Sequence, residues 1–128
     1  LTLLLAMLAL FLARWWQSQL EHPGAFGPEF GSLRLGLALG ASSAVVIVAS
    51  LVTKLALVDD IARLFMGALV LVGLGAAHRA AQGGRLASGW LWGIYLALVL
   101  VAPVTVAVLA AWGFADNWRR SRETAQVA

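Results

Sequence analysis

Long uncharged apolar segments, separated by short stretches that hold nearly all of the charge, constrain this chain more than any other feature. The longest, Trp90 to Phe114, contains no Asp, Glu, Lys or Arg, and about 20 apolar residues are enough to cross a bilayer. A segment inside lipid must satisfy its own backbone hydrogen bonds, so it has to be helical. The sequence therefore predicts an all-α integral membrane protein.

Four apolar segments divide the chain, and Trp and Tyr residues gather at their ends, as is typical of membrane interfaces. We expect a polytopic transmembrane helix bundle with about four membrane helices, forming a single transmembrane domain over residues 1–128. Because the sequence starts inside an apolar run, we interpret this domain as the C-terminal part of a longer protein. The predicted segments are Leu1–Trp16, Leu35–Val52, Ile61–Ala77 and Trp90–Phe114.

The links between the segments predict their arrangement. The second link is so short that the second and third segments are expected to form an antiparallel hairpin, with Asp59 as the N-cap of the third. Arg63 is spaced to pair with Asp59 at i, i+4. If all four segments cross the membrane, both termini lie on the side of this link. The basic cluster Arg119–Arg122 favours a cytoplasmic C-terminus.

Small residues and one proline predict how the helices pack and bend. Gly36 with Gly40, and Gly89 with Gly93, repeat at four-residue spacing, which lets the backbones of neighbouring helices approach. Pro103, in the middle of the last segment, removes a helix hydrogen bond and predicts a kink. A static bend is the simpler interpretation of Pro103, and a hinge lining a cavity is the alternative.

Signatures of catalysis are missing from the sequence. There is no Cys, which excludes disulfides and thiolate sites, and His22 and His78 lack carboxylates at metal-ligand spacing. The glycines of Val72–Ala77 follow no predicted strand, so they do not form a dinucleotide-binding loop. The net charge of +3 comes from basic residues at helix ends, where lipid headgroups account for them. We expect no enzyme activity, no cofactor, no metal and no nucleic-acid partner.

The residues least explained by burial in lipid lie in the link Gln17–Arg34 and after the last segment. A short interfacial helix is predicted to begin near Pro28, with Phe30 in the headgroup region. Asp116 precedes Arg120 by four residues, a spacing that supports a helix. The simpler interpretation is topology and anchoring to anionic lipid, and the sharper one is recognition of a partner or solute. The predicted interface residues are Phe26, Glu29, Phe30, Arg34, Asp116, Trp118, Arg119 and Arg120.

The same two regions carry a family resemblance. Trp15-Trp16-Gln17, His22–Phe30 and Leu33-Arg34-Leu35, together with Gly113–Arg120, resemble the proteobacterial branch of the YybS-like membrane proteins, which carry a domain of unknown function (number 2232). His22 stands where that branch usually has Asn, and Ala25 where it usually has Gly. The hydrophobic-Asp-Phe pattern before the basic pair is absent.

The resemblance implies a multi-pass protein of the bacterial inner (cytoplasmic) membrane. It also implies a distant similarity to the substrate-binding subunits of energy-coupling-factor vitamin transporters, and hence a transport-related, solute-binding role. No ligand residue of those transporters can be placed on this sequence. The alternative function is a non-catalytic structural or accessory subunit of a larger membrane complex. The expected partners are membrane lipids and other membrane protein subunits, with a small-molecule solute under the transport hypothesis.

Overall fold

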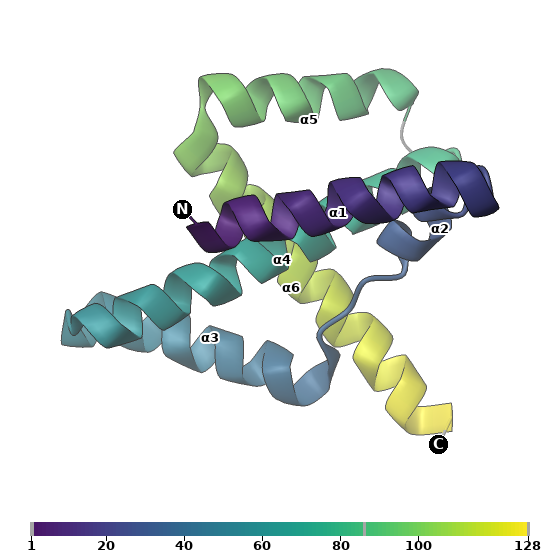
Figure 1. Ribbon diagram of the computed structural model, residues 1–128. Coiled ribbons are helices and arrows are strands. Elements are labelled where there is room, and N and C mark those ends of the chain that lie inside the picture. The colour runs from purple at the N-terminus through teal and green to yellow at the C-terminus, as the bar shows by residue number, and fades with distance from the viewer. Residues whose placement is uncertain (1, 86, 128) are drawn as a thin grey trace.

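The computed structural model describes residues 2–85 and 87–127, and every element in these ranges is a helix (Figure 1). The predicted all-α class is confirmed. Leu1, where the first apolar segment was expected to begin, lies outside the described residues, as does Ala128 at the end of the expected domain. The elements are α1 Thr2–Glu21, α2 Phe26–Gly31, α3 Gly36–Thr53, α4 Ala56–Gln82, α5 Ser88–Leu100 and α6 Ala102–Val127.

One helix of the described residues, α3, is both long enough and apolar enough to cross a bilayer. At about 1.5 Å per residue its 18 residues extend roughly 27 Å, close to the roughly 30 Å of a hydrocarbon core. The apolar stretch Gly89–Leu100 of α5 is shorter. The structure therefore supports association with a membrane through α3, and it does not confirm a bundle of four crossing helices.

α3 and α4 form the antiparallel hairpin predicted from their short link (Figure 1). Lys54 ends α3 in the left-handed conformation, with φ 48°. Two details of the prediction are wrong. Asp59 lies inside α4, where its N–H donates to the carbonyl of Leu55 at 3.0 Å, so it is not the N-cap. Arg63 pairs with Asp60, at 2.5 Å, instead of with Asp59.

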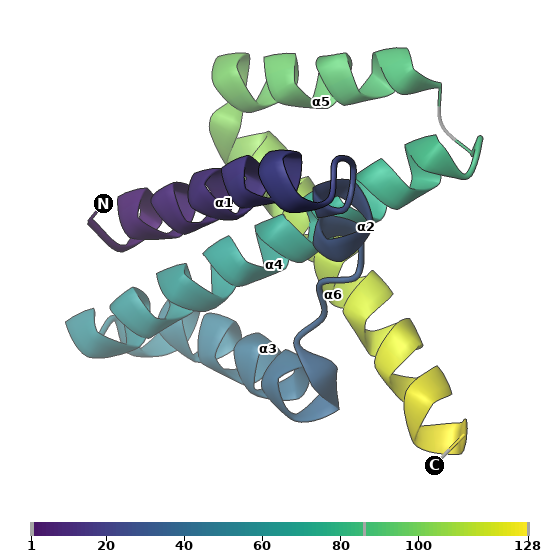
Figure 2. The same ribbon diagram turned by 45° about the vertical axis from the view of Figure 1, so that its right-hand side comes forward.

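The last apolar segment is not one helix, which corrects the expectation for Trp90–Phe114. α5 ends at Leu100, Val101 leaves helical geometry with φ −132° and ψ 50°, and α6 begins at Ala102. Pro103 lies in the first turn of α6, where a missing N–H costs nothing. In a continued helix its ring would clash with the preceding turn. The predicted kink is thus a complete break at which the chain reverses direction (Figures 1 and 2).

This reversal moves the C-terminus to the other end of the molecule. Asn117 of α6 bonds Gly36 at the start of α3, and Asp116 pairs with Arg79 near the end of α4. Figure 2 shows the N-terminus near the α3–α4 link, and the C-terminus at the end that holds α2 and the α4–α5 link. The expectation that both termini share the side of the α3–α4 link is therefore wrong.

The core lies where α4 and α6 cross, with α3 packed beside them (Figure 1). Gly73 and Gly113 bring the two backbones into direct contact at the crossing point. Around them the buried apolar residues are Ala62, Leu69, Val72, Ala76, Ala77, Leu109 and Ala110. Most large apolar side chains of α1, α3 and α5 remain exposed, such as Leu10, Leu51 and Val99.

Candidate functional site

A buried polar group joins α6 to the chain before α3, and we call it the polar junction. It consists of Arg34, Arg79, Asp116, Asn117 and Arg120 with the backbone of residues 32–36. It brings together the two regions that sequence analysis singled out, the link before α3 and the polar end of α6.

Asn117 of α6 is fully buried. Its side chain caps the N-terminus of α3, although it belongs to another helix. Its Oδ1 accepts hydrogen bonds from the backbone N–H of Leu35, at 2.6 Å, and of Gly36, at 3.1 Å. Its Nδ2 donates to the carbonyl of Gly36 at 2.9 Å. The first N–H groups of a helix lack intrahelical partners, so Asn117 performs the task of an N-cap from a residue 81 positions away.

Asp116 is the charged centre of the polar junction and is only 6% exposed. Its Oδ2 lies 2.5 Å from Nη2 of Arg79 and 3.3 Å from Nη1 of Arg120. Arg119 lies further away, at 3.5 Å from Oδ1, and is largely exposed. A buried carboxylate is costly unless it is paired and hydrogen-bonded, and here opposite charges from α4 and α6 meet that requirement.

Arg120 extends the polar junction to the backbone before α3. Its guanidinium donates to the carbonyls of Leu33, at 3.2 Å, and Ser32, at 3.1 Å. Arg34 reaches in the opposite direction and donates to Oγ1 of Thr124 at 2.5 Å. Thr124 in turn donates to the carbonyl of Arg120 at 3.0 Å. These contacts tie two segments about 90 residues apart into one unit.

An aromatic cluster stands beside the polar junction and holds α2 in place. The predicted short helix exists as α2, but Phe30 packs inside the molecule. Its ring centroid is 5.7 Å from Phe11 of α1 and 5.5 Å from His78 of α4. Phe26 stacks on Phe30 at 5.8 Å. His78 donates through Nδ1 to a backbone carbonyl at 2.9 Å, which fixes its ring.

Glu29 lies on the outer side of α2 and pairs with Arg14 of α1. The two side chains meet at 2.5 Å and 2.9 Å in a two-point contact. The hydrogen bond from the guanidinium holds the pKa of Glu29 below its ordinary value. Both side chains are exposed, so this pair fixes the position of α2 against α1 more than it stabilises the fold.

Trp118 and Arg119 face outward, as Glu29 and Arg34 also do. Arg119 is 67% exposed at its side chain, and Trp118 is 39% exposed with its ring 6.0 Å from Phe114. Sequence analysis did not assign roles to Asn117 or Arg79. The available signal was a polar Asn-Asp pair directly after an apolar helix, but nothing in the sequence named its partners.

Within residues 2–85 and 87–127, no group of three His, Asp or Glu side chains could hold a metal ion. Two open clefts are present instead, of about 280 Å³ between α3 and α4 and about 300 Å³ between α3, α4 and α6.

Comparison with known proteins returns no match. No family model, no curated protein and no solved structure matches this chain. The resemblance to the YybS-like membrane proteins therefore stays a prediction, and function has to be argued from the geometry.

Proposed function

We propose that this chain is a multi-pass protein of the bacterial cytoplasmic membrane that acts as a non-catalytic structural or accessory subunit. The observation that carries the proposal is the polar junction, in which interior charges are engaged with one another. Asp116 meets Arg79 and Arg120, and Asn117 is satisfied by the start of α3. Transporter cores usually keep intramembrane polar groups for their substrate or ion.

The helix lengths support a specific arrangement in the membrane. α1, α3 and α4 cross the bilayer, each with 18 or more residues. α5 has 13 residues, about 20 Å at 1.5 Å per residue, which is shorter than the hydrocarbon core. α5 and the apolar first half of α6 therefore form a hairpin that enters from one side and returns to it. At the apex, Thr105 donates its N–H and its hydroxyl to the carbonyl of Val101, both at 3.1 Å.

The distribution of basic residues supports an orientation for this arrangement. The end of the molecule that holds the polar junction, here called the basic end, carries seven of the nine Lys and Arg residues. The opposite end, around the α3–α4 link, carries Lys54 and Arg63. Basic residues are enriched on the cytoplasmic side, so the basic end is cytoplasmic. Its members are Arg14, Arg34, Arg79, Arg85, Arg119, Arg120 and Arg122.

α5 supplies the surface for a partner subunit in this proposal. Trp92 and Val99 are 80% and 78% exposed, so α5 covers little of its apolar surface within the chain. Gly89 and Gly93 have no described atom within 4 Å of the place a Cβ would take, so a second helix can approach that face closely.

Site-specific photo-crosslinking in native membranes tests the accessory role. We expect a photoreactive residue at Trp92 to give a discrete cross-linked protein band. The same residue at Leu57, exposed at the other end of the molecule, serves as the matched control and should give none. Lipid adducts alone at both positions would overturn the proposal.

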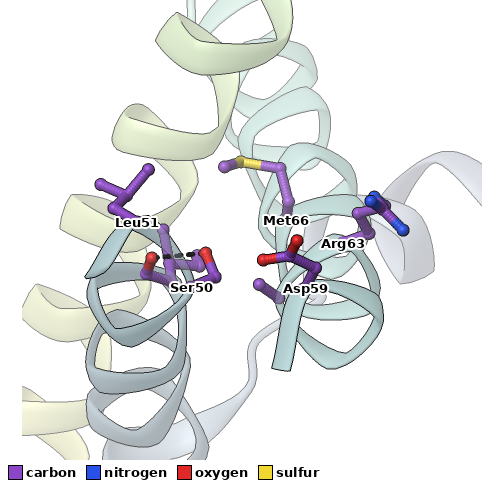
Figure 3. A pocket seen from close by; sticks show the side chains of 7 residues that line it. Ser50, Leu51, Asp59, Arg63 and Met66 are labelled. Atoms are coloured by element: carbon purple, nitrogen blue, oxygen red, sulfur yellow. Dashed lines mark hydrogen bonds between the residues drawn. The ribbon is translucent and has the colours of Figure 1, made fainter. Parts of the chain in front are cut away.

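A second candidate, a transport-related solute-binding subunit, is supported by one observation. The cleft between α3 and α4 holds a carboxylate, that of Asp59, beside apolar walls (Figure 3). Purification in mild detergent followed by mass spectrometry separates the two candidates. A stoichiometric protein partner without a small molecule favours the accessory role, and a retained solute on the isolated chain favours solute binding.

A further inference from the structure

The cleft between α3 and α4 carries a carboxylate without a partner. In Figure 3 the carboxylate of Asp59 points into the space between the two helices, while the guanidinium of Arg63 points away from it. Arg63 is held by Asp60, at 2.5 Å. Among the described residues, Asp59 has no side-chain hydrogen bond or ion pair. Asp59 is partly exposed in the first turn of α4, where the helix dipole favours a carboxylate, and its acceptor oxygens remain open to a ligand in the cleft.

The walls around this carboxylate are mostly apolar, and Arg63, which also lines the cleft, has its guanidinium paired with Asp60. Ile47 and Leu51 of α3 and Met66 of α4 line the cleft, which measures about 280 Å³. Ser50 also lines it, but its hydroxyl donates to the carbonyl of Ile47 at 2.7 Å, so it already has a hydrogen-bond acceptor. Asp59 therefore gives the cleft a negative charge at one end of an apolar surface.

The apolar surface continues into the second cleft. The two clefts share Ile47 and Met66 in their walls. The second one measures about 300 Å³ and is bounded by side chains such as Leu69, Ala107 and Phe114, with almost no polar surface. The two clefts adjoin at these shared residues, and we call the pair the path: one cleft holds a carboxylate, and the other lies among apolar side chains of α3, α4 and α6. Its ligand must be charged at one end and apolar along the rest.

We propose that this path binds an amphiphile with a primary ammonium group and an apolar chain. The ammonium sits against Asp59, where opposite charges attract and the ammonium N–H groups donate to the carboxylate oxygens. The chain lies over Ile47 and Met66 and enters the second cleft. Two sources share this chemistry, a free alkylamine and a membrane lipid with an ammonium headgroup. The inference rests on the second proposed function, because it names the ligand class of that cleft.

Methionine methyl NMR tests the ligand class on the whole chain. The protein has two Met residues. Met66 lines both clefts, whereas Met7 lies on α1, outside both of them. The protein is labelled at the methionine methyl groups and reconstituted in phosphatidylglycerol nanodiscs, which contain no ammonium group. Hexylammonium is then titrated, with hexanol as the uncharged match.

We expect hexylammonium to shift the Met66 signal saturably and to leave Met7 unmoved. Asp59→Asn should weaken this binding at least tenfold, whereas Glu123→Gln, which removes an exposed carboxylate outside both clefts, should leave it within twofold. Ala107 is exposed and lines the second cleft. Ala107→Phe should fill that cleft and weaken the binding of hexylammonium as well. A retained Met7 signal position and an unchanged melting temperature in each ligand-free variant show that the fold is intact.

The outcomes separate the ligand class from the wider proposal. If hexanol and hexylammonium shift the Met66 signal equally, or if Asp59→Asn binds hexylammonium as tightly as the parent protein does, the ammonium assignment is wrong. The cleft would then bind apolar solutes without regard to charge. No shift of Met66 by either compound would overturn solute binding in this cleft altogether. Phosphatidylethanolamine is then added to the nanodiscs. If it shifts the Met66 signal only when Asp59 is present, and competes with hexylammonium, the ligand is a membrane lipid. If only the free amine does so, the source is a soluble amine.

Discussion

Gly73 of α4 and Gly113 of α6 lie face to face where the two helices cross, with no room for a side chain between them. A Cβ on Gly73 would collide with the carbonyl oxygen of Leu109, and one on Gly113 would collide with the carbonyl oxygen of Leu69. The obstacle in each case is backbone, which cannot move aside as a flexible side chain can. Such close crossings allow weak Cα–H···O contacts between helices.

The first prediction concerns this crossing. Gly73→Ala or Gly113→Ala should push α4 and α6 apart and lower the free energy of unfolding by about 1–3 kcal/mol, the usual cost of overpacking. Gly67→Ala is the matched control, because a Cβ there meets no described atom within 4 Å and alanine favours a helix more than glycine does. Thermal unfolding in a mild detergent measures the difference. An unchanged melting temperature in both crossing variants would contradict the close approach.

The second prediction compares two neighbouring basic residues of α6, Arg119 and Arg120. Arg120→Gln removes a partner of buried Asp116 and two donors to the backbone of residues 32 and 33. Asp116 keeps Arg79 at 2.5 Å, so we expect a loss of about 1.5–3 kcal/mol, as for losing hydrogen bonds that involve a charged group. Arg119→Gln removes an exposed charge 3.5 Å from the same carboxylate and should cost less than about 1 kcal/mol. Chemical denaturation of both variants tests the ranking, and equal losses would argue against a buried polar junction.

The third prediction concerns the sides of the membrane. Single cysteines at Gly27, Gly84 and Gln126 should be labelled from the same side, and a cysteine at Asp60 from the other. The physical reason is the reversal at Val101, which returns α6 to the basic end. A membrane-impermeant maleimide on intact and opened cells makes the measurement. Labelling of Gln126 together with Asp60 would mean that α5 and α6 cross as one helix.

The fourth prediction concerns pH. Because Arg14 lowers the pKa of Glu29 below 4.5 in the folded protein, the pair stabilises the fold above that pH and its contribution disappears as the pH falls through the folded pKa. Glu29→Gln should therefore be slightly less stable than the parent at neutral pH and equal to it in acid. Glu123→Gln, at an exposed position with no ion pair to any residue that the structure describes, should show no such convergence. A carboxyl NMR titration that places Glu29 at or above 4.5 would contradict the pairing.

Local patterns predicted local structure well. The helical class, the α3–α4 hairpin and the short helix near Pro28 were all predicted from apolar length, link length and turn residues. In each of these cases the residues that make the feature are neighbours in the sequence. The spacing of Asp116 and Arg120 belongs to the same group, since the structure holds that pair at 3.3 Å within α6.

Contacts between distant residues could not be predicted in this way. Gly73 and Gly113 belong to different helices, so no spacing rule joins them, while the predicted pair Gly89 and Gly93 faces open space. Asn117 caps a helix that begins 81 residues earlier. The uncharged composition of Trp90–Phe114 is equally compatible with one helix that crosses the membrane and with two shorter helices that form a hairpin. Pro103 was the available signal for the second arrangement, and its effect was underestimated.

In the proposed arrangement, the break at Val101 also decides whether the chain crosses the membrane an odd or an even number of times. In this arrangement, the three arginines in the second half of α6 lie on the same side as those of the α1–α3 and α4–α5 links, and the basic residues divide seven against two. A straight helix through the same residues would carry these arginines to the side of Lys54 and Arg63, and the division would be five against four. A single residue outside helical geometry thus turns a nearly balanced charge distribution into a strong directional signal for membrane insertion.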